Sequence, residues 1–101
     1  MNQMQQMLME AQRLQRELVK AHEELDAKEF IVKKAGIVEL VIKGDKTVKS
    51  LQIEKEALTA DNKEMIEETI VMAINEGLQE IKTEGDAIDE RITGRKGALP
   101  F

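Results

Sequence analysis

The chain has no cysteine, tryptophan or tyrosine, and Phe30 and Phe101 are its two aromatic residues. The absence of cysteine excludes disulfide scaffolds, thiolate catalysis and cysteine-ligated zinc. The shortage of aromatic rings argues against a single-strand-binding protein that stacks bases on a row of aromatic side chains. The one histidine, His22, stands next to two glutamates. We expect it to be a surface residue with no catalytic or metal-binding role.

Catalytic and membrane-spanning patterns are missing as well. Ser50 is the one serine and has no base near it in the sequence, and residues 94–97 lack the spacing of a phosphate-binding loop. We therefore expect no enzymatic activity, no metal, no cofactor and no small-molecule substrate. The longest apolar run, residues 70–74, is far shorter than the ~20 residues of a membrane span. Residues 1–9 lack the basic start of a signal peptide, so we expect no membrane association and a cytoplasmic location.

The length of 101 residues predicts a single domain, residues 1–101. Its order is a helix at about 3–28, three strands between about 30 and 53, a helix at about 63–91 and a tail at 92–101. The strands are expected at 30–34, 37–43 and 47–53, because Ile, Val, Leu and Thr are concentrated there. The fold class is α+β with a three-stranded antiparallel sheet. Asp61 or Asn62 is the expected N-cap of the second helix.

The apolar residues of the first helix follow a heptad spacing of 3, 4, 3, 4, 3 and 4: Met4, Met7, Ala11, Leu14, Leu18, Ala21 and Leu25. This narrow apolar seam predicts packing against another helix. The second helix is apolar on every side at residues 70–74, which indicates burial by the sheet and by a second subunit. Its mid-helix glycine predicts close packing against another backbone. We therefore expect a homodimer whose interface includes Ile70, Ala73, Ile74 and Gly77.

Charge is unevenly distributed over the chain, whose formal net charge is −5. Residues 51–90 hold three basic and twelve acidic side chains. On the first helix, Arg13, Arg16 and Lys20 form a stripe opposite the apolar seam, with Gln12 beside it. Basic side chains mixed with glutamine can contact phosphates and base edges. The alternative is a solvated outer face with local pairs such as Arg13–Glu17, and the residues alone favour this alternative.

Four segments, taken together, resemble the YbaB/EbfC family of bacterial nucleoid-associated proteins. They are the Met- and Gln-rich start with residues 11–15, the hairpin strand at 48–54, the helical segment 73–78 and the closing residues 92–101. The resemblance covers nearly the whole chain and depends on the order and spacing of all four.

The resemblance implies a homodimer with projecting paired helices that binds double-stranded DNA, alters its conformation and contributes to nucleoid organisation and gene regulation. It implies no enzymatic activity and no cofactor. The DNA-contacting residues that it indicates are Gln12, Arg13, Arg16 and Lys20 on the first helix and Lys82 on the second. The basic end of the chain adds Arg91, Arg95 and Lys96 as further candidates. The alternative function is a protein–protein adaptor whose acidic helices bind a basic partner.

Overall fold

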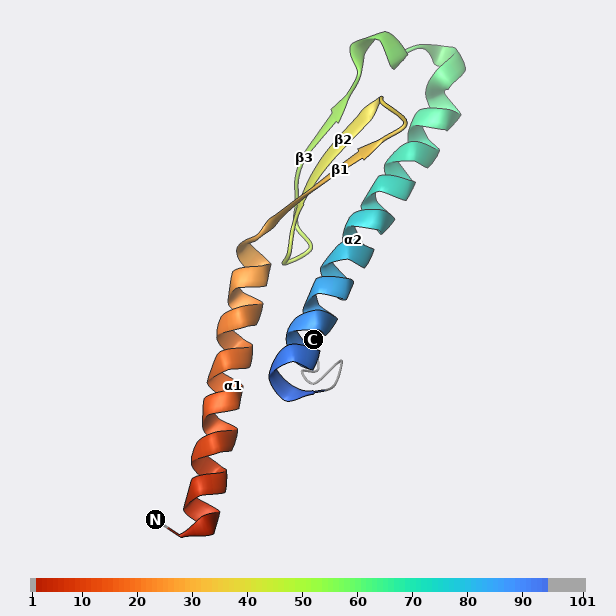
Figure 1. The fold of residues 1–101 in the computed structure, drawn as a ribbon. Helices are drawn as coiled ribbons and strands as arrows, with labels where there is room; N and C mark the ends of the chain where they lie inside the picture. The colour runs from red at the N-terminus through yellow and green to blue at the C-terminus, as the bar shows by residue number, and fades with distance from the viewer. Residues whose placement is uncertain (1, 95–101) are drawn as a thin grey trace.

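The structure is a computed structural model, and it describes residues 2–94. A long helix, a three-stranded sheet and a second long helix follow one another (Figure 1). The elements are α1 (Gln3–Ala27), β1 (Glu29–Lys34), β2 (Val38–Lys43), β3 (Val48–Ile53), η1 (Lys55–Ala57), η2 (Ala60–Asn62) and α2 (Lys63–Thr93). The predicted α+β class and the predicted element order are confirmed. Residues 95–101 of the predicted tail lie outside the described residues.

The sheet is antiparallel throughout, with the strand order β1-β2-β3. Val38, Leu40 and Ile42 alternate along β2 and are almost fully buried, because this face of the strand packs under α2. The residues between them are half-buried. The predicted division of β2 into an apolar face and a mixed face is therefore confirmed. The register shifts between Val41 and Ile42, which pair with Ser50 and Val48, so β3 has one extra residue, Lys49, at this point.

Helix α2 crosses the sheet over β1 and β2. Ala73 has no exposed surface, and Gly77 is also buried at this crossing. A Cβ added to Gly77 would lie 2.8 Å from Cγ2 of Ile42, which is too close without a shift of that side chain. The glycine therefore lets α2 approach a side chain of its own sheet, and the expectation that it meets another backbone is wrong.

The apolar seam of α1 is covered over its C-terminal half only. Leu18 and Leu25 are buried in the described residues, whereas Met4 and Met7 are 78% and 67% exposed. The reason is length, because the N-terminal turns of α1 continue beyond the end of α2 (Figure 1). The prediction that the seam packs against a helix therefore holds for its C-terminal half within one chain.

The helix ends follow ordinary capping chemistry with one exception. Asn2 and Gln5 form a reciprocal capping box at the start of α1, and Gly94 ends α2 with a φ of 82°. Asn62 occupies the predicted N-cap position of α2, but its side chain makes no capping hydrogen bond. Its Nδ2 instead donates to the carbonyl of Ala57 at 2.9 Å and closes the connector that precedes the helix.

His22 is not the surface residue that its neighbours in the sequence predicted. It is 8% exposed, and its Nε2 lies 2.7 Å from Oδ1 of Asp89, which is 3% exposed. The two residues are 67 positions apart in the chain, so the contact depends on the packing of α1 against α2.

No helix within residues 2–94 is long and apolar enough to cross a membrane.

Candidate nucleic-acid interface

The basic stripe of α1, formed by Arg13, Arg16 and Lys20, lies on the outer surface of the molecule. All three side chains are exposed, as is Gln12 beside them. The opposite side of the helix is occupied by its buried residues Leu18, His22 and Leu25. Spacings of three and four residues bring side chains onto one helix face, so burial of the seam determines which way the stripe points. The predicted outward orientation of these residues is confirmed.

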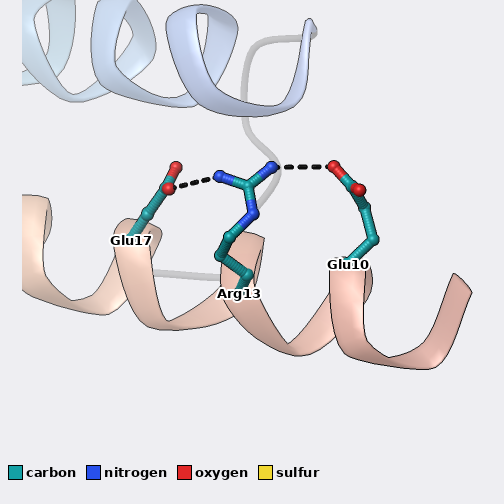
Figure 2. Close-up of polar contacts among 3 residues, drawn as sticks. All are labelled: Glu10, Arg13 and Glu17. Atoms are coloured by element: carbon teal, nitrogen blue, oxygen red, sulfur yellow. Dashed lines mark hydrogen bonds and ion pairs between the residues drawn. The ribbon is translucent and has the colours of Figure 1, made fainter. Parts of the chain in front are cut away.

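Arg13 is held by carboxylates on both sides (Figure 2). Its Nη2 donates to Oε1 of Glu10 and its Nη1 to Oε1 of Glu17, each at 2.7 Å. The hydrogen bond to Glu10 and the charge of Glu17 raise the pKa of Arg13 above its ordinary value. Two negative charges therefore surround one positive charge, and the donors that a phosphate would use are engaged. This part of the stripe matches the alternative of local ion pairs.

Arg16 and Lys20 differ from Arg13 in this respect. Within residues 2–94, neither side chain has a carboxylate within ion-pairing distance. They lie one turn apart on the same face, at the spacing that places helical side chains one above the other. Their cationic groups are therefore the two on the stripe that can bind an external anion without first breaking an ion pair to another residue of the described part of the chain.

Lys82 has a different environment on α2. Its Nζ donates to Oδ2 of Asp86 at 2.9 Å. The residue lines a groove of about 960 Å³ between the two helices and the β2–β3 turn. The charged side chains of this groove, apart from His22, are four carboxylates and two amines: Asp26, Asp45, Asp86, Asp89, Lys46 and Lys82. This excess of negative charge makes the groove unfavourable for a nucleic-acid backbone, whereas the outer stripe of α1 is more favourable.

The remaining predicted contact residues are at the end of the chain. Arg91 is exposed in the last turn of α2, where a positive side chain also complements the helix dipole. Arg95 and Lys96 lie outside the described residues. Among residues 2–94, no group of three or more His, Cys, Asp or Glu side chains is arranged to hold a metal ion.

A second candidate surface is apolar and lies where α2 leaves β3 uncovered. Leu51 faces Leu40 across the ladder and Val48 faces Ile42, so both share the face that α2 covers elsewhere. They are nevertheless 42% and 45% exposed. Of the predicted interface residues, Ile70 and Ile74 are partly buried and pack against the core. Ala73 and Gly77 are buried against their own sheet and offer little surface to another subunit.

Comparison with known proteins identifies the family. Residues 1–96 match the YbaB/EbfC DNA-binding family. The chain belongs to the YbaB/EbfC DNA-binding family. The resemblance that the sequence motifs predicted is therefore confirmed over nearly the whole chain.

Similar proteins and a similar structure support this membership. A nucleoid-associated protein of Malacoplasma penetrans is 37% identical over 97% of this chain and 98% of its own length. A nucleoid-associated protein of Enterococcus faecalis is 34% identical over 86% of this chain and 85% of its own. The crystal structure of an uncharacterized protein from Helicobacter pylori has the same fold, with a TM-score of 0.71 and 18% identity, over 90% of this chain and 96% of that one.

Proposed function

We propose that this member of the YbaB/EbfC family is a nucleoid-associated protein that binds double-stranded DNA through the outer face of α1. The observation that carries the proposal is the exposure of Arg16 and Lys20 on a face turned away from the protein core, without an ion pair among residues 2–94. Phosphate contacts of this kind position a protein on the duplex and carry little sequence information. Recognition then depends on the DNA backbone and its shape, and binding alters the conformation of the duplex.

The protein acts as a homodimer in this proposal. The support is the exposure of Val48 and Leu51 on the face of β3 that α2 leaves uncovered, together with the incomplete burial of Ile70 and Ile74 of α2 against the core. A second copy of the same surface would bury these side chains and continue the core. Two copies also present two basic stripes, which raises the number of phosphates contacted at once. In the cell, this activity contributes to nucleoid organisation and gene regulation in the cytoplasm.

Salt-dependent binding tests the DNA proposal. Arg16 and Lys20 from two protomers can neutralise four phosphates, which predicts a slope of log K against log salt of about −3.6 at roughly −0.9 per phosphate. Arg16→Ala should reduce the magnitude of this slope by about 2 per dimer and weaken binding to all duplex sequences alike. Lys63→Ala is the matched control, because Lys63 is equally cationic and 76% exposed at the far end of α2. It should leave the slope unchanged.

Two results would contradict this arrangement. If Arg16→Ala leaves affinity and slope unchanged while Arg95→Ala abolishes binding, the basic end of the chain holds the DNA instead. If duplex DNA does not bind at low salt and a basic protein does, the adaptor function is correct. The dimer is tested by sedimentation of Leu51→Asp, since a carboxylate buried without a partner opposes association. Wild type should sediment at twice the chain mass and the variant at the chain mass.

A further inference from the structure

The contact between His22 and Asp89 joins α1 to α2 inside the protein. The two side chains are 11% and 5% exposed, and the Nε2–Oδ1 distance is 2.7 Å. This distance is that of a hydrogen bond between the imidazole and the carboxyl group, in which Nε2–H of the tautomer that carries the proton there donates to Oδ1. The side chain of His22 also faces Gly85 of α2, where an added Cβ would lie 3.8 Å from its Cε1. His22 is thus enclosed by α2 on the inner side of α1.

The basic stripe lies on the same helix as His22 and on its other side. Arg16 is six residues from His22 and Lys20 is two residues from it, which at 1.5 Å per residue is about 9 Å and about 3 Å along the axis. The neighbouring side chains of α1 that pack inward are Leu18, Ala21 and Leu25, which are apolar. At the sheet end of the helix, the backbone carbonyl of Asp26 also accepts a hydrogen bond from the N–H of Asp45. Apolar contacts have no directional preference, whereas a hydrogen bond weakens steeply when its angle changes. The polar contact therefore limits rotation of α1 about its own axis.

The length of α1 enlarges the effect of any change at this contact. Gln3 is nineteen residues from His22, which is about 28 Å along the helix. A tilt of about 10° at His22 would move the N-terminal end of α1 by about 5 Å, and a rotation of about 20° would move the cations of the stripe by about 3 Å. The same tilt would move Arg16, about 9 Å from His22, by only about 1.6 Å. Hydrogen bonds to phosphate are made within about 3 Å, so the rotation is the change that would separate the stripe from the DNA backbone.

We infer that His22 and Asp89 are positioning residues for DNA binding, which fix the direction in which α1 presents Arg16 and Lys20. This inference rests on the proposed function of the stripe. The hydrogen bond between them sets the rotation and tilt of α1 relative to α2, and the apolar contacts of the seam hold the two helices together. A second polar contact between the helices joins Lys28 and Glu84, whose side chains are 52% and 37% exposed. It lies at the sheet end of α1, so it has less control than His22 over the N-terminal end of the helix.

The test replaces the polar contact by an apolar one of similar size. His22→Leu combined with Asp89→Leu removes the hydrogen bond, and replacement of a buried ion pair by packed apolar residues is often neutral or stabilising for the fold. The double variant loses the negative charge of Asp89, and this loss alone would favour DNA binding. A decrease in affinity therefore cannot result from charge. Lys28→Ala combined with Glu84→Ala removes the exposed contact between the helices and leaves the net charge unchanged.

Two measurements are made on the full chain, which has no cysteine of its own. Spin labels at Met9→Cys and Glu80→Cys, diluted with unlabelled protein, report the distance distribution between α1 and α2. Duplex DNA binding is measured on the unlabelled variants. In the double leucine variant we expect a cooperative melting transition, a broadened or displaced distance distribution and about a tenfold loss of affinity. The control variant Lys28→Ala with Glu84→Ala should keep the wild-type distance distribution and bind duplex DNA within about twofold of the wild-type affinity.

A conservative pair covers the case in which the leucine variant does not fold. His22→Gln places an amide Nε2 where it can donate to Asp89, whereas the shorter His22→Asn cannot reach. We expect His22→Gln to retain the distance distribution and the affinity, and His22→Asn to lose both. The inference is overturned if the two amide variants behave alike, or if the leucine variant keeps the wild-type distribution and affinity. It is also overturned by a changed distribution with unchanged affinity, while failure of Arg16→Ala to weaken binding counts separately against the proposed stripe.

Discussion

Removing the carboxylates that surround Arg13 should strengthen DNA binding. Glu10→Gln combined with Glu17→Gln leaves the chain length and side-chain shape of both partners intact but removes their charges. Arg13 at present donates to both carboxylates at 2.7 Å (Figure 2). The three side chains are between 45% and 63% exposed, so their loss should have little effect on the fold. Freed of its partners, Arg13 becomes available for a phosphate on the same face as Arg16 and Lys20.

The magnitude follows from the number of cations on the stripe. Two additional cations per dimer raise the neutralised phosphates from four to six and change the slope of log K against log salt from about −3.6 to about −5.4. If the plots of log K against log salt for wild type and variant meet at 1 M salt, the difference of about 1.8 between their slopes corresponds to roughly a 60-fold gain in affinity at 0.1 M salt. Fluorescence anisotropy with one duplex over a range of salt concentrations measures both quantities.

The control must separate release of Arg13 from the change in net charge. Glu23→Gln combined with Glu24→Gln removes the same two charges from the same helix, and both residues are exposed. Neither contacts Arg13 within the described part of the chain. This control should raise affinity through weaker long-range repulsion and leave the slope near that of wild type. If both double variants change affinity and slope equally, Arg13 does not bind phosphate and the reasoning is refuted.

Two further predictions concern stability. Gly44→Ala should lower the melting temperature clearly, because its added Cβ would lie 1.7 Å from the carbonyl oxygen of Leu25, and overpacking costs about 1–3 kcal/mol, with each kcal/mol worth about 4–8 °C. Gly85→Ala is the matched control, since its Cβ would meet ordinary contacts at 3.5 and 3.8 Å; equal melting temperatures for the two variants would contradict this account. The hydroxyl of Thr47, and then its backbone N–H, lower the pKa of Asp45 below its ordinary value of 3.8. This stabilisation is therefore complete above that value and is lost as the pH falls through the lowered pKa, so the stability difference between wild type and Asp45→Asn at pH 7 should disappear once the pH is below the lowered pKa. A difference that persists at that pH, in denaturant unfolding, would show that the carboxylate charge is not its source.

The sequence by itself determined the features that depend on neighbouring residues. Helix α1 follows from its heptad spacing, and the buried face of β2 follows from the alternation of Val38, Leu40 and Ile42. The direction of the basic stripe follows from the same seam, because helical periodicity places Arg16 and Lys20 opposite it. The local pair between Arg13 and Glu17 could also be anticipated, since residues four apart on a helix are neighbours.

Only the tertiary structure decided which surface each helix shares with a distant segment. His22 stands among glutamates in the sequence, and its burial depends on Asp89, which is 67 residues away. Ala73 and Gly77 carry the pattern of an interface, yet their own sheet covers them, because small residues allow close approach to Ile42 as well as to another subunit. The apolar residues of α1 likewise keep one heptad spacing along the whole helix, but α2 covers them only as far as its own end. Periodicity specifies which face of an element is apolar, whereas the lengths and crossing of the packed elements specify what covers that face.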